Sequence, residues 1–451
     1  MNQPKPVSPG TLDPTFCKNG VRYFPDPAVY GMPSAVIALP DNKSLVVMDP
    51  PVQDGKVIVA RLNEDGALDT TFGPAQYGYV EVFIDATEVN IYGLSSLANG
   101  GWLMVGQFIR SGRDSGLLVV RQLQDGQLDK SLNGDGILFI PFAEIGNSQY
   151  ASMEVEANRF NGKNSLDAAP QATGNAGMSA IEQSDGKIVL VTAVRDAQRR
   201  WKGIVLRRNA DGSRDETFNG DGFAIVELKD VEHKDNFGSG VAVQTGGQVL
   251  VCGLYDIGNG FMGAYVTCFT STGSIDKSFN NGLAVTVLYE GWIDLHTITV
   301  SERDGKIVAV GNARSNRAQK GLVVVLNKSG SYNLLFNNGE ALFSEVVPQG
   351  HDWLRCALKP DGNIIVTGTT GNGSITDNPE LLTAHYRPDG KLDPTFNSGK
   401  GYTVHDEEQG IAAGRDMAVM ADGRILVCGN LYKDAEPQPY IIGGLLLRYL
   451  G

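Results

Sequence analysis

Short apolar runs bounded by turn residues recur along the whole chain. Between residues 239 and 288 there are four of them: 239–244, 248–253, 264–269 and 283–288, each rich in Val, Leu and other strand-forming residues. Runs of this length between Gly, Asn and Asp are typical of β-strands. No amphipathic stretch is long enough to predict a helix with a 3.6-residue period. The pattern therefore predicts an all-β chain.

A segment of the form Gly-x-Leu-Asp-x-x-Phe follows the third run of each set. Its acidic or amide position is occupied seven times, by Asp13, Asp69, Asp129, Asp215, Asp276, Asn333 and Asp393. Successive positions are 56, 60, 86, 61, 57 and 60 residues apart, so the third interval carries about 26 extra residues. A second motif, an Asp-Gly turn before an apolar run, lies between the copies, as in 185–190 and 304–309. The chain is therefore a tandem repeat of about sixty residues.

Four antiparallel strands in each repeat, here called A to D in chain order, make one blade of a β-propeller. The last repeat ends at its strand C, and residues 10–16 with 21–24 supply the motif and the missing strand D. We therefore predict an all-β, seven-bladed β-propeller in one domain, in which the N- and C-terminal segments close one shared blade. The predicted blades are 32–85, 90–140, 177–228, 238–288, 294–346, 351–404 and 412–450 completed by 20–25. Residues 141–177 are predicted to be an inserted loop, either a binding flap or a disordered segment.

The repeated residues have structural roles in this interpretation. The Asp carboxylate is expected to cap a tight turn between strands C and D, and the Leu and Phe to pack between blades. The tandem Gly-x-Leu-Asp-x-x-Phe with Asp-Gly-Lys-Ile-x-Val resembles the bacterial "delta sixty" repeat family. That resemblance implies a propeller of unassigned function and no catalytic residues. The sequence departs from it at Leu132, Asn333 and at three positions of the usual Leu: Arg214, Ile275 and Tyr332.

Charge and composition narrow the choice of partner. Lys and Arg total 38 against 51 Asp and Glu, a formal net charge of −13, which disfavours nucleic acid as a partner. No apolar run approaches the roughly 20 residues of a membrane-spanning helix. The first ten residues lack the apolar segment of a secretory signal, so we expect a cytoplasmic protein, with export without an N-terminal signal as the alternative. Five scattered cysteines and five scattered histidines predict no metal site and no cofactor.

Several enzyme signatures are absent, including Gly-x-Ser-x-Gly, His-Glu-x-x-His and a Gly-Lys-Ser/Thr phosphate loop. The single Gly-x-Gly-x-x-Gly, at 258–263, lies between two predicted strands, so it is a hairpin turn and not a dinucleotide site. We therefore expect a monomeric, non-enzymatic module that binds a protein or a glycan. The alternative is a propeller-type hydrolase or lyase that uses the carboxylates of Asp294, Asp352 or Glu407 at the channel mouth.

In a propeller, the B–C and D–A connections share one face, here called the variable-loop face, because the length variation at 141–177, 371–380 and 431–443 falls there. Basic and aromatic side chains also gather in these connections, which suits an anionic ligand or a sugar. The alternatives to ligand binding are that the basic side chains are ordinary solvated charges and that the tryptophans pack between blades. The candidate ligand-binding residues are Arg110, Arg113, Arg199, Arg200, Trp201, Lys202, Trp292, Asp294, Arg314, Arg317 and Trp353.

Overall fold

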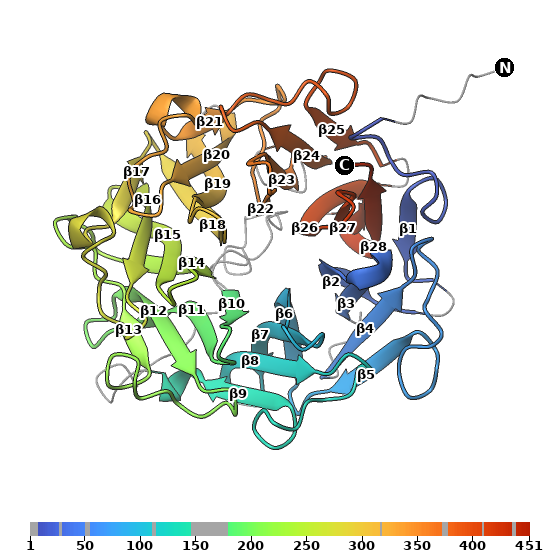
Figure 1. The fold of residues 1–451 in the computed structure, drawn as a ribbon, viewed down its shortest axis with the longest axis horizontal. Helices are drawn as coiled ribbons and strands as arrows, with labels where there is room; N and C mark the ends of the chain where they lie inside the picture. Colours follow the sequence, from blue (N-terminus) through green and yellow to red (C-terminus); the bar gives the residue numbers. More distant parts are fainter. Residues whose placement is uncertain are drawn as a thin grey trace.

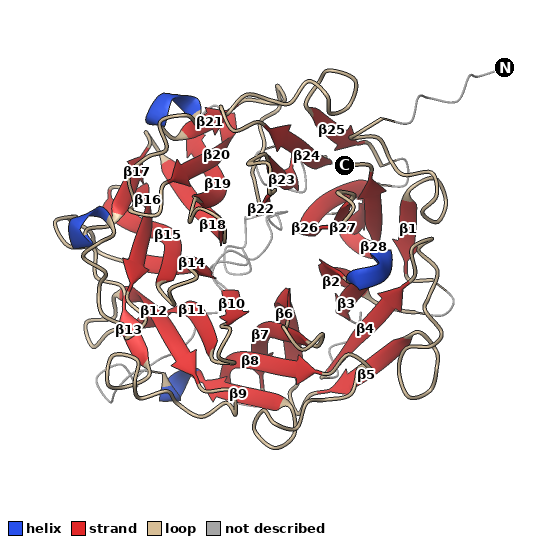
Figure 2. Cartoon of the chain, in the orientation of Figure 1, coloured by secondary structure: helices blue, strands red, loops and turns tan. Residues whose placement is uncertain are grey.

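The computed structural model describes residues 8–26, 29–49, 55–110, 114–145, 179–315, 318–371, 378–407, 410–434 and 439–451. Seven four-stranded antiparallel sheets are arranged around a central axis, as Figure 1 shows. Among the described residues the only helices are short 3-10 turns, drawn blue in Figure 2. The chain is a seven-bladed β-propeller, as predicted.

We number the blades in chain order, and strand A of each blade lies nearest the axis. Blade 1 holds β2 (Met32–Ala38), β3 (Ser44–Asp49), β4 (Lys56–Leu62) and β5 (Tyr79–Phe83). Blade 2 holds β6 (Glu88–Ser96), β7 (Trp102–Ile109), β8 (Ser115–Gln122) and β9 (Ile137–Pro141). Blade 3 holds β10 (Ser179–Glu182), β11 (Ile188–Arg195), β12 (Trp201–Arg208) and β13 (Phe223–Ile225). Blade 4 holds β14 (Asn236–Val243), β15 (Val249–Gly258), β16 (Phe261–Phe269) and β17 (Val285–Leu288).

The second half of the ring follows the same order. Blade 5 holds β18 (Trp292–Val300), β19 (Ile307–Ser315), β20 (Ala318–Leu326) and β21 (Leu342–Ser344). Blade 6 holds β22 (Arg355–Leu358), β23 (Ile364–Thr369), β24 (Leu381–Tyr386) and β25 (Tyr402–His405). Blade 7 holds β26 (Ile411–Val419), β27 (Ile425–Lys433) and β28 (Tyr440–Tyr449), with β1 (Val21–Phe24) as its outer strand. The 3-10 turns are η1 (Pro40–Asn42), η2 (Phe142–Glu144), η3 (Asn280–Gly282) and η4 (Asn337–Gly339).

Both ends of the chain contribute to blade 7, which closes the ring. Strand β1 pairs antiparallel with β28, from Val21 opposite Leu447 to Phe24 opposite Gly444. Nearby, the Gly10 N–H donates to the Leu450 carbonyl at 2.8 Å. The innermost strands of blades 7 and 1, β26 and β2, also lie against each other. The predicted closure is confirmed, and the predicted insertion lies almost entirely outside the described residues.

The conserved turn between strands C and D owes its shape to the repeated Asp. In blade 1, Asp69 Oδ1 accepts hydrogen bonds from the Thr71 N–H and from Thr71 Oγ1, the latter at 2.6 Å. Arg61 Nε, on strand C, donates to Asp69 Oδ2 at 2.7 Å, and its guanidinium lies 4.6 Å above the ring of Phe72. Blades 3 and 7 repeat this trio with Arg207, Asp215 and Phe218 and with Arg448, Asp13 and Phe16. In these three blades the motif therefore contains a small ion pair covered by an aromatic ring.

The last residue of the motif also joins one blade to the next. Phe279 of blade 4 packs under Gly330, which has φ 84° and begins the motif of blade 5, so a Cβ on that glycine would lie 3.0 Å from the ring. Glycine tolerates both the positive φ and the close approach. The same contact occurs at all seven blade junctions: Phe16–Gly66, Phe72–Gly126, Leu132–Gly212, Phe218–Gly273, Phe279–Gly330, Phe336–Gly390 and Phe396–Gly10. The two junctions to which the N-terminal segment contributes, Phe16–Gly66 and Phe396–Gly10, are thus built like the other five.

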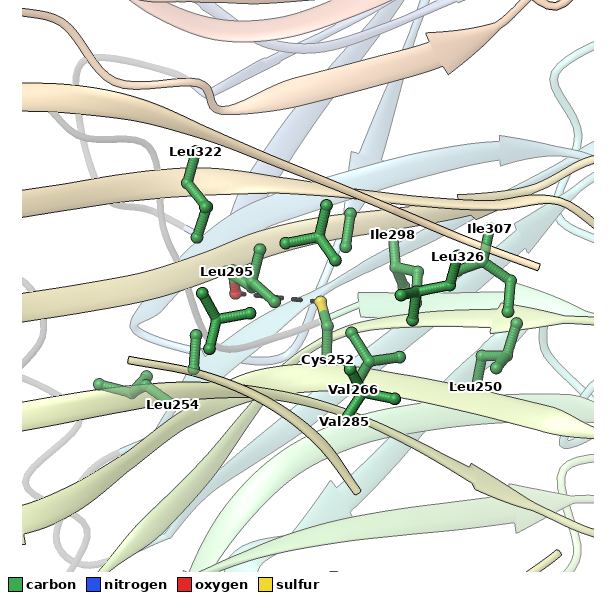
Figure 3. Close-up of a cluster of buried hydrophobic side chains, with 14 of the residues drawn as sticks. Leu250, Cys252, Leu254, Val266, Val285, Leu295, Ile298, Ile307, Leu322 and Leu326 are labelled. Atoms are coloured by element: carbon green, nitrogen blue, oxygen red, sulfur yellow. Dashed lines mark hydrogen bonds between the residues drawn. The ribbon is translucent and has the colours of Figure 1, made fainter. Parts of the chain in front are cut away.

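Apolar side chains fill the space between neighbouring blades. Between blades 4 and 5, Leu250 and Val266 face Leu295 and Ile307, as Figure 3 shows. Cys252 is fully buried in this cluster, with Sγ 3.9 Å from the Leu295 carbonyl oxygen. Cys252 therefore serves as a small buried hydrophobe, the role that its place in a strand predicts.

Candidate functional site

A hollow of about 420 Å³ opens on the variable-loop face of blade 3. One wall is the B–C turn between β11 and β12, from Asp196 to Lys202, and the other is the D–A connection that follows β13, from Ile225 to His233. Its volume falls within the range usual for small-ligand sites. Arg200 and Lys202 of the basic segment that the sequence singles out therefore line a concave surface, whereas Arg199 and Trp201 do not.

The B–C wall is held in one conformation by Asp196. Its Oδ1 accepts from the N–H groups of Gln198 and Arg200, and its Oδ2 accepts from Arg200 Nε, all at 2.9 Å. Arg199, between them, has a φ of 60° and an exposed side chain. Burial acts to raise the pKa of Asp196, but the hydrogen bonds from Arg200 outweigh it and keep the pKa below its usual value. Both carboxylate oxygens of Asp196 therefore accept hydrogen bonds from within the turn.

The D–A wall is fastened to strand C by two consecutive side chains. Strand β13 pairs only with residues 204–206 of β12, which leaves backbone donors nearer the rim without a strand partner. Asp235 Oδ1 accepts from the Trp201 N–H and Asn236 Oδ1 from the Gly203 N–H, both at 2.7 Å. Asn236 Nδ2 lies 3.1 Å from His233 Nε2, while His233 Nδ1 lies 2.8 Å from the Val231 carbonyl oxygen. The hollow is therefore preformed on both sides.

Positive charge in the hollow is only partly neutralised. Arg200 pairs with Asp196, yet its side chain is 45% exposed. Lys202 and Lys229, one from each wall, form no ion pair with any described residue, and neither does Glu227. Two free ammonium groups against one free carboxylate leave the hollow suited to an anionic group.

The indole ring of Trp201 does not line the hollow and contacts two neighbouring side chains. The guanidinium of Arg195 lies 4.7 Å from the indole centroid, and the ring of Phe237 lies 5.6 Å away on blade 4. The indole is half-buried. These contacts hold the ring on the face of β12 opposite Lys202, since neighbouring side chains of a strand point to opposite faces.

Two further predicted residues meet in blade 5. Trp292 and Arg314 lie directly opposite each other in the first pair of β18 and β19, and both are exposed at the rim. Arg110 of blade 2 belongs neither to the hollow of blade 3 nor to the pair of Trp292 and Arg314. It pairs with Asp85 and Asp114 and lies 4.1 Å above the ring of Phe139, so its charge is already compensated.

Trp353 does not reach the rim. Its indole is fully buried, and Nε1 donates to Ser344 Oγ at 2.9 Å. We expected Trp353 on the variable-loop face with Trp292, but the carbonyls of Asp352 and Asp294 approach Gly368 and Gly311 in the same way, so these two acids, and not the two tryptophans, occupy equivalent positions. Trp353 therefore corresponds to the core residue that follows Asp294.

The three acids of the alternative hydrolase interpretation have separate partners. Asp294 Oδ2 lies 3.6 Å from His296 Nδ1, and Asp352 Oδ1 accepts from the Thr369 N–H at 2.8 Å. Glu407 contacts His405 and Tyr23. Burial raises the pKa of Asp294 to about 8 and that of Asp352 to about 7. All three side chains are buried, so Asp294 is also withdrawn from the ligand-binding surface.

Some predicted elements fall outside the described residues: Arg113, Arg317, residues 146–177 of the insertion and the middles of the loops 371–380 and 431–443. Within the described ranges, no group of three or more His, Cys, Asp or Glu side chains is placed to hold a metal ion. No helix there has the length and apolar character needed to cross a bilayer.

The opposite wall of the hollow was missed by sequence reasoning. Lys229 and His233 belong to the D–A connection of blade 3, residues 226–235, which is rich in charge and longer than the connection 289–291 that follows blade 4. Its length was the available signal. Only the three-dimensional path shows that this connection faces the B–C turn of its own blade.

Comparisons with known proteins support an uncharacterised propeller family. A family model described as "Domain of unknown function (DUF5122) beta-propeller" matches residues 54–72, 183–218 and 359–396, parts of blades 1, 3 and 6. A search of curated proteins finds no match.

Solved structures resemble the chain over nearly its whole length at low identity. A protein of unknown function from Dyadobacter fermentans DSM 18053 is 10% identical, with a TM-score of 0.41 over 95% of this chain and 99% of its own. Sqt1 from Chaetomium thermophilum is 12% identical, with a TM-score of 0.42 over 93% and 82%. A glucose dehydrogenase is 11% identical, with a TM-score of 0.39 over 95% and 98%. Likeness at this level adds nothing to the argument; the description of the family model and the arrangement of the seven sheets agree on a β-propeller.

Proposed function

We propose that the protein is a binding module that receives an anionic group of its ligand in the hollow of blade 3. The observation that carries this proposal is the pair of ammonium groups of Lys202 and Lys229, which converge on one preformed hollow from two walls without an ion-pair partner among the described residues. Charges left uncompensated in a concave site attract a complementary group more strongly than the same charges on an open surface.

Arg199 and Arg200, in the B–C turn, belong to the same site in this proposal. Arg200 supplies a guanidinium already oriented by Asp196, so little side-chain entropy is lost on binding. Trp201 contributes through its backbone, because its N–H bonds to Asp235 and fastens the D–A wall to strand C. A carboxylate on a protein or on an acidic sugar fits this combination.

A binding role is better supported than the hydrolase alternative. General acid and base catalysis requires two groups within reach of the same substrate. Asp294, Asp352 and Glu407 are buried with different partners, and none of them lines the hollow. The repeat pattern supports placing this propeller with the delta sixty repeats, for which no reaction is implied.

The test uses a glycan array that includes acidic sugars and a displayed library of random dodecapeptides. Binding by the intact protein is compared with binding by the double variant Lys202→Glu/Lys229→Glu. The matched control is Lys391→Glu/Lys400→Glu, which makes the same charge change at exposed lysines of blade 6 on the opposite face. We expect the hollow variant to weaken binding at least tenfold, with the loss smaller in high salt, and the control to bind like the wild type. Equal binding by all three proteins would refute the proposal.

A further inference from the structure

We infer that the ligand is a protein segment that combines a carboxylate with apolar side chains, and that blade 4 receives the apolar part. This inference rests on the proposed function of the hollow and adds a second contact surface to it. The surface, here called the blade 4 patch, consists of Ile257, Phe261, Leu288 and Trp292, which are 43%, 47%, 63% and 36% exposed. Large apolar side chains grouped at a surface usually mark a site of protein contact.

Backbone pairing brings these four residues together at one rim. Phe261 pairs with Gly258 at the tip of the β15–β16 hairpin, directly after Ile257. Leu288 pairs with Gly263 at the end of β17. The Met262 N–H donates to the Gly291 carbonyl at 3.1 Å, which ties the hairpin tip to the start of β18 and therefore to Trp292. The patch thus occupies the variable-loop end of blade 4 and the adjacent edge of blade 5.

The patch is joined to the hollow by a hydrogen-bonded strip of backbone. The Asp256 N–H donates to the Asp235 carbonyl at 2.8 Å, and the Lys234 N–H donates to the Asp256 carbonyl at 3.0 Å. Asp235 in turn accepts from the Trp201 N–H. One ligand lying across blades 3 and 4 can therefore contact both surfaces.

The chemistry of the patch favours a protein over a glycan. A sugar binds through an aromatic face and through hydrogen bonds to its hydroxyl groups, whereas Ile257 and Leu288 provide neither. Covering them with hydroxyl groups would desolvate polar atoms without a partner. Apolar side chains of a peptide would instead bury these residues at a gain of roughly 25 cal/mol per Å².

Charge fixes the direction in which such a segment lies. The free ammonium groups of Lys202 and Lys229 are at the blade 3 end, while at the blade 5 end the exposed Glu290 is accompanied by the exposed Arg314, which lies opposite Trp292. A carboxylate is attracted more strongly to the first end, where two ammonium groups line a concave surface, than to the second, where the opposite charges offset each other. The acidic residue of the partner therefore sits in the hollow and its apolar residues extend towards Trp292.

The experiment selects displayed random dodecapeptides on the intact protein and measures the Kd of the enriched peptides. Three double variants are compared: the hollow variant Lys202→Glu/Lys229→Glu, the patch variant Phe261→Ser/Leu288→Ser and the control Leu334→Ser/Leu335→Ser. Leu334 and Leu335 are 80% and 77% exposed in the C–D turn of blade 5, on the opposite face, so they match the patch in chemistry. Thermal melting of each variant verifies that it is folded.

We expect enriched peptides to combine an acidic residue with aliphatic or aromatic ones, and their Kd to rise at least tenfold in the hollow variant and in the patch variant but not in the control. If only the hollow variant weakens binding, the inference is overturned and the proposed function stands. If only acidic glycans bind, the partner is a sugar and the inference is likewise overturned. Failure of the hollow variant to change any binding overturns both.

Discussion

Arg355 on β22 donates from Nε to Oδ1 of Asp416 on β26 at 2.9 Å, an ion pair between the innermost strands of blades 6 and 7. The same two residues reach two more blades, because Arg355 Nη2 donates to the Tyr92 carbonyl of blade 2 at 3.3 Å and Asp416 Oδ2 accepts from the Val36 N–H of blade 1 at 2.9 Å. Blades 1, 2, 6 and 7 are thus connected, and blade 7 is the one in which the two ends of the chain pair. The pair therefore reinforces ring closure from the inside, in addition to the pairing of β1 with β28.

Replacing Arg355 with Met is expected to lower the free energy of unfolding by about 3 kcal/mol, because Asp416 would keep its charge without its partner. Denaturant unfolding measures the loss. Hydrogen exchange should quicken in β2, β22 and β26 before the rest of the ring. The matched control is Arg387→Met, whose side chain is 41% exposed and paired at the surface with Asp389, and its cost should stay below about 0.5 kcal/mol. A similar small cost for Arg355→Met would contradict the role of the pair.

Phe279→Ala should cost about 3 to 5 kcal/mol, because it empties the space under Gly330 and between blades 4 and 5. Chemical denaturation is again the measurement. Leu334→Ala is the control, since Leu334 occupies a variable position of the same motif one blade later and is 80% exposed. A loss below about 1 kcal/mol for Phe279→Ala would show that the ring is not part of the junction.

Blade 5 has Val325 and Asn333 where blade 1 has the ion pair of Arg61 and Asp69. Val325→Arg alone should destabilise the protein by about 2 kcal/mol or more, because the guanidinium would be buried without an anion. The double variant Val325→Arg/Asn333→Asp should recover most of that loss, with a coupling energy of at least about 1.5 kcal/mol in a double-mutant cycle. If the two free-energy changes simply added, the ion pair would depend on other residues of its blade as well as on these two.

Asp294 predicts a pH dependence of stability with a defined sign. Its pKa rises from the ordinary 3.8 to about 8 in the folded protein because of burial. From about pH 4 to about pH 8 the folded protein keeps a proton that the unfolded chain releases, so the contribution of Asp294 to stability falls as the pH rises. Asp294→Asn cannot ionise, and its stability relative to the wild type should increase over this window by up to about 1.4 kcal/mol per pH unit.

Thermal melts of both proteins at several values between pH 5 and 8 provide the comparison. Asp211→Asn is the control, because Asp211 is exposed and hydrogen bonds from Ser213 lower its pKa. Its difference from the wild type should stay flat over the same range. A flat difference for Asp294→Asn as well would mean that Asp294 is ionised when folded.

The sequence predicted the ring because each blade repeats one local solution. Asp69 caps its own turn and Phe72 reaches only the next blade, so spacing along the chain is enough to place them. The sequence singled out Lys202 but not Lys229, because Lys229 lies near Lys202 through the path of a connection that has no repeat to compare with. The hairpin tip with Phe261 extends beyond the strands predicted for blade 4, so the apolar patch had no counterpart in the sequence pattern. Trp353 was misplaced by three positions, which sufficed to turn a buried side chain into an expected rim residue.

The contact of Phe396 with Gly10 has a consequence for chain topology. It joins blade 6 to the first residues of the chain in the same way that Phe72 joins blade 1 to Gly126, and the Gly10 N–H already bonds to the Leu450 carbonyl. No contact between neighbouring blades therefore requires the chain to begin and end in blade 7. A circular permutant whose original ends are linked and whose new ends open between β5 of blade 1 and β6 of blade 2, in the connection 84–87, should form the same propeller with blade 7 as one continuous segment.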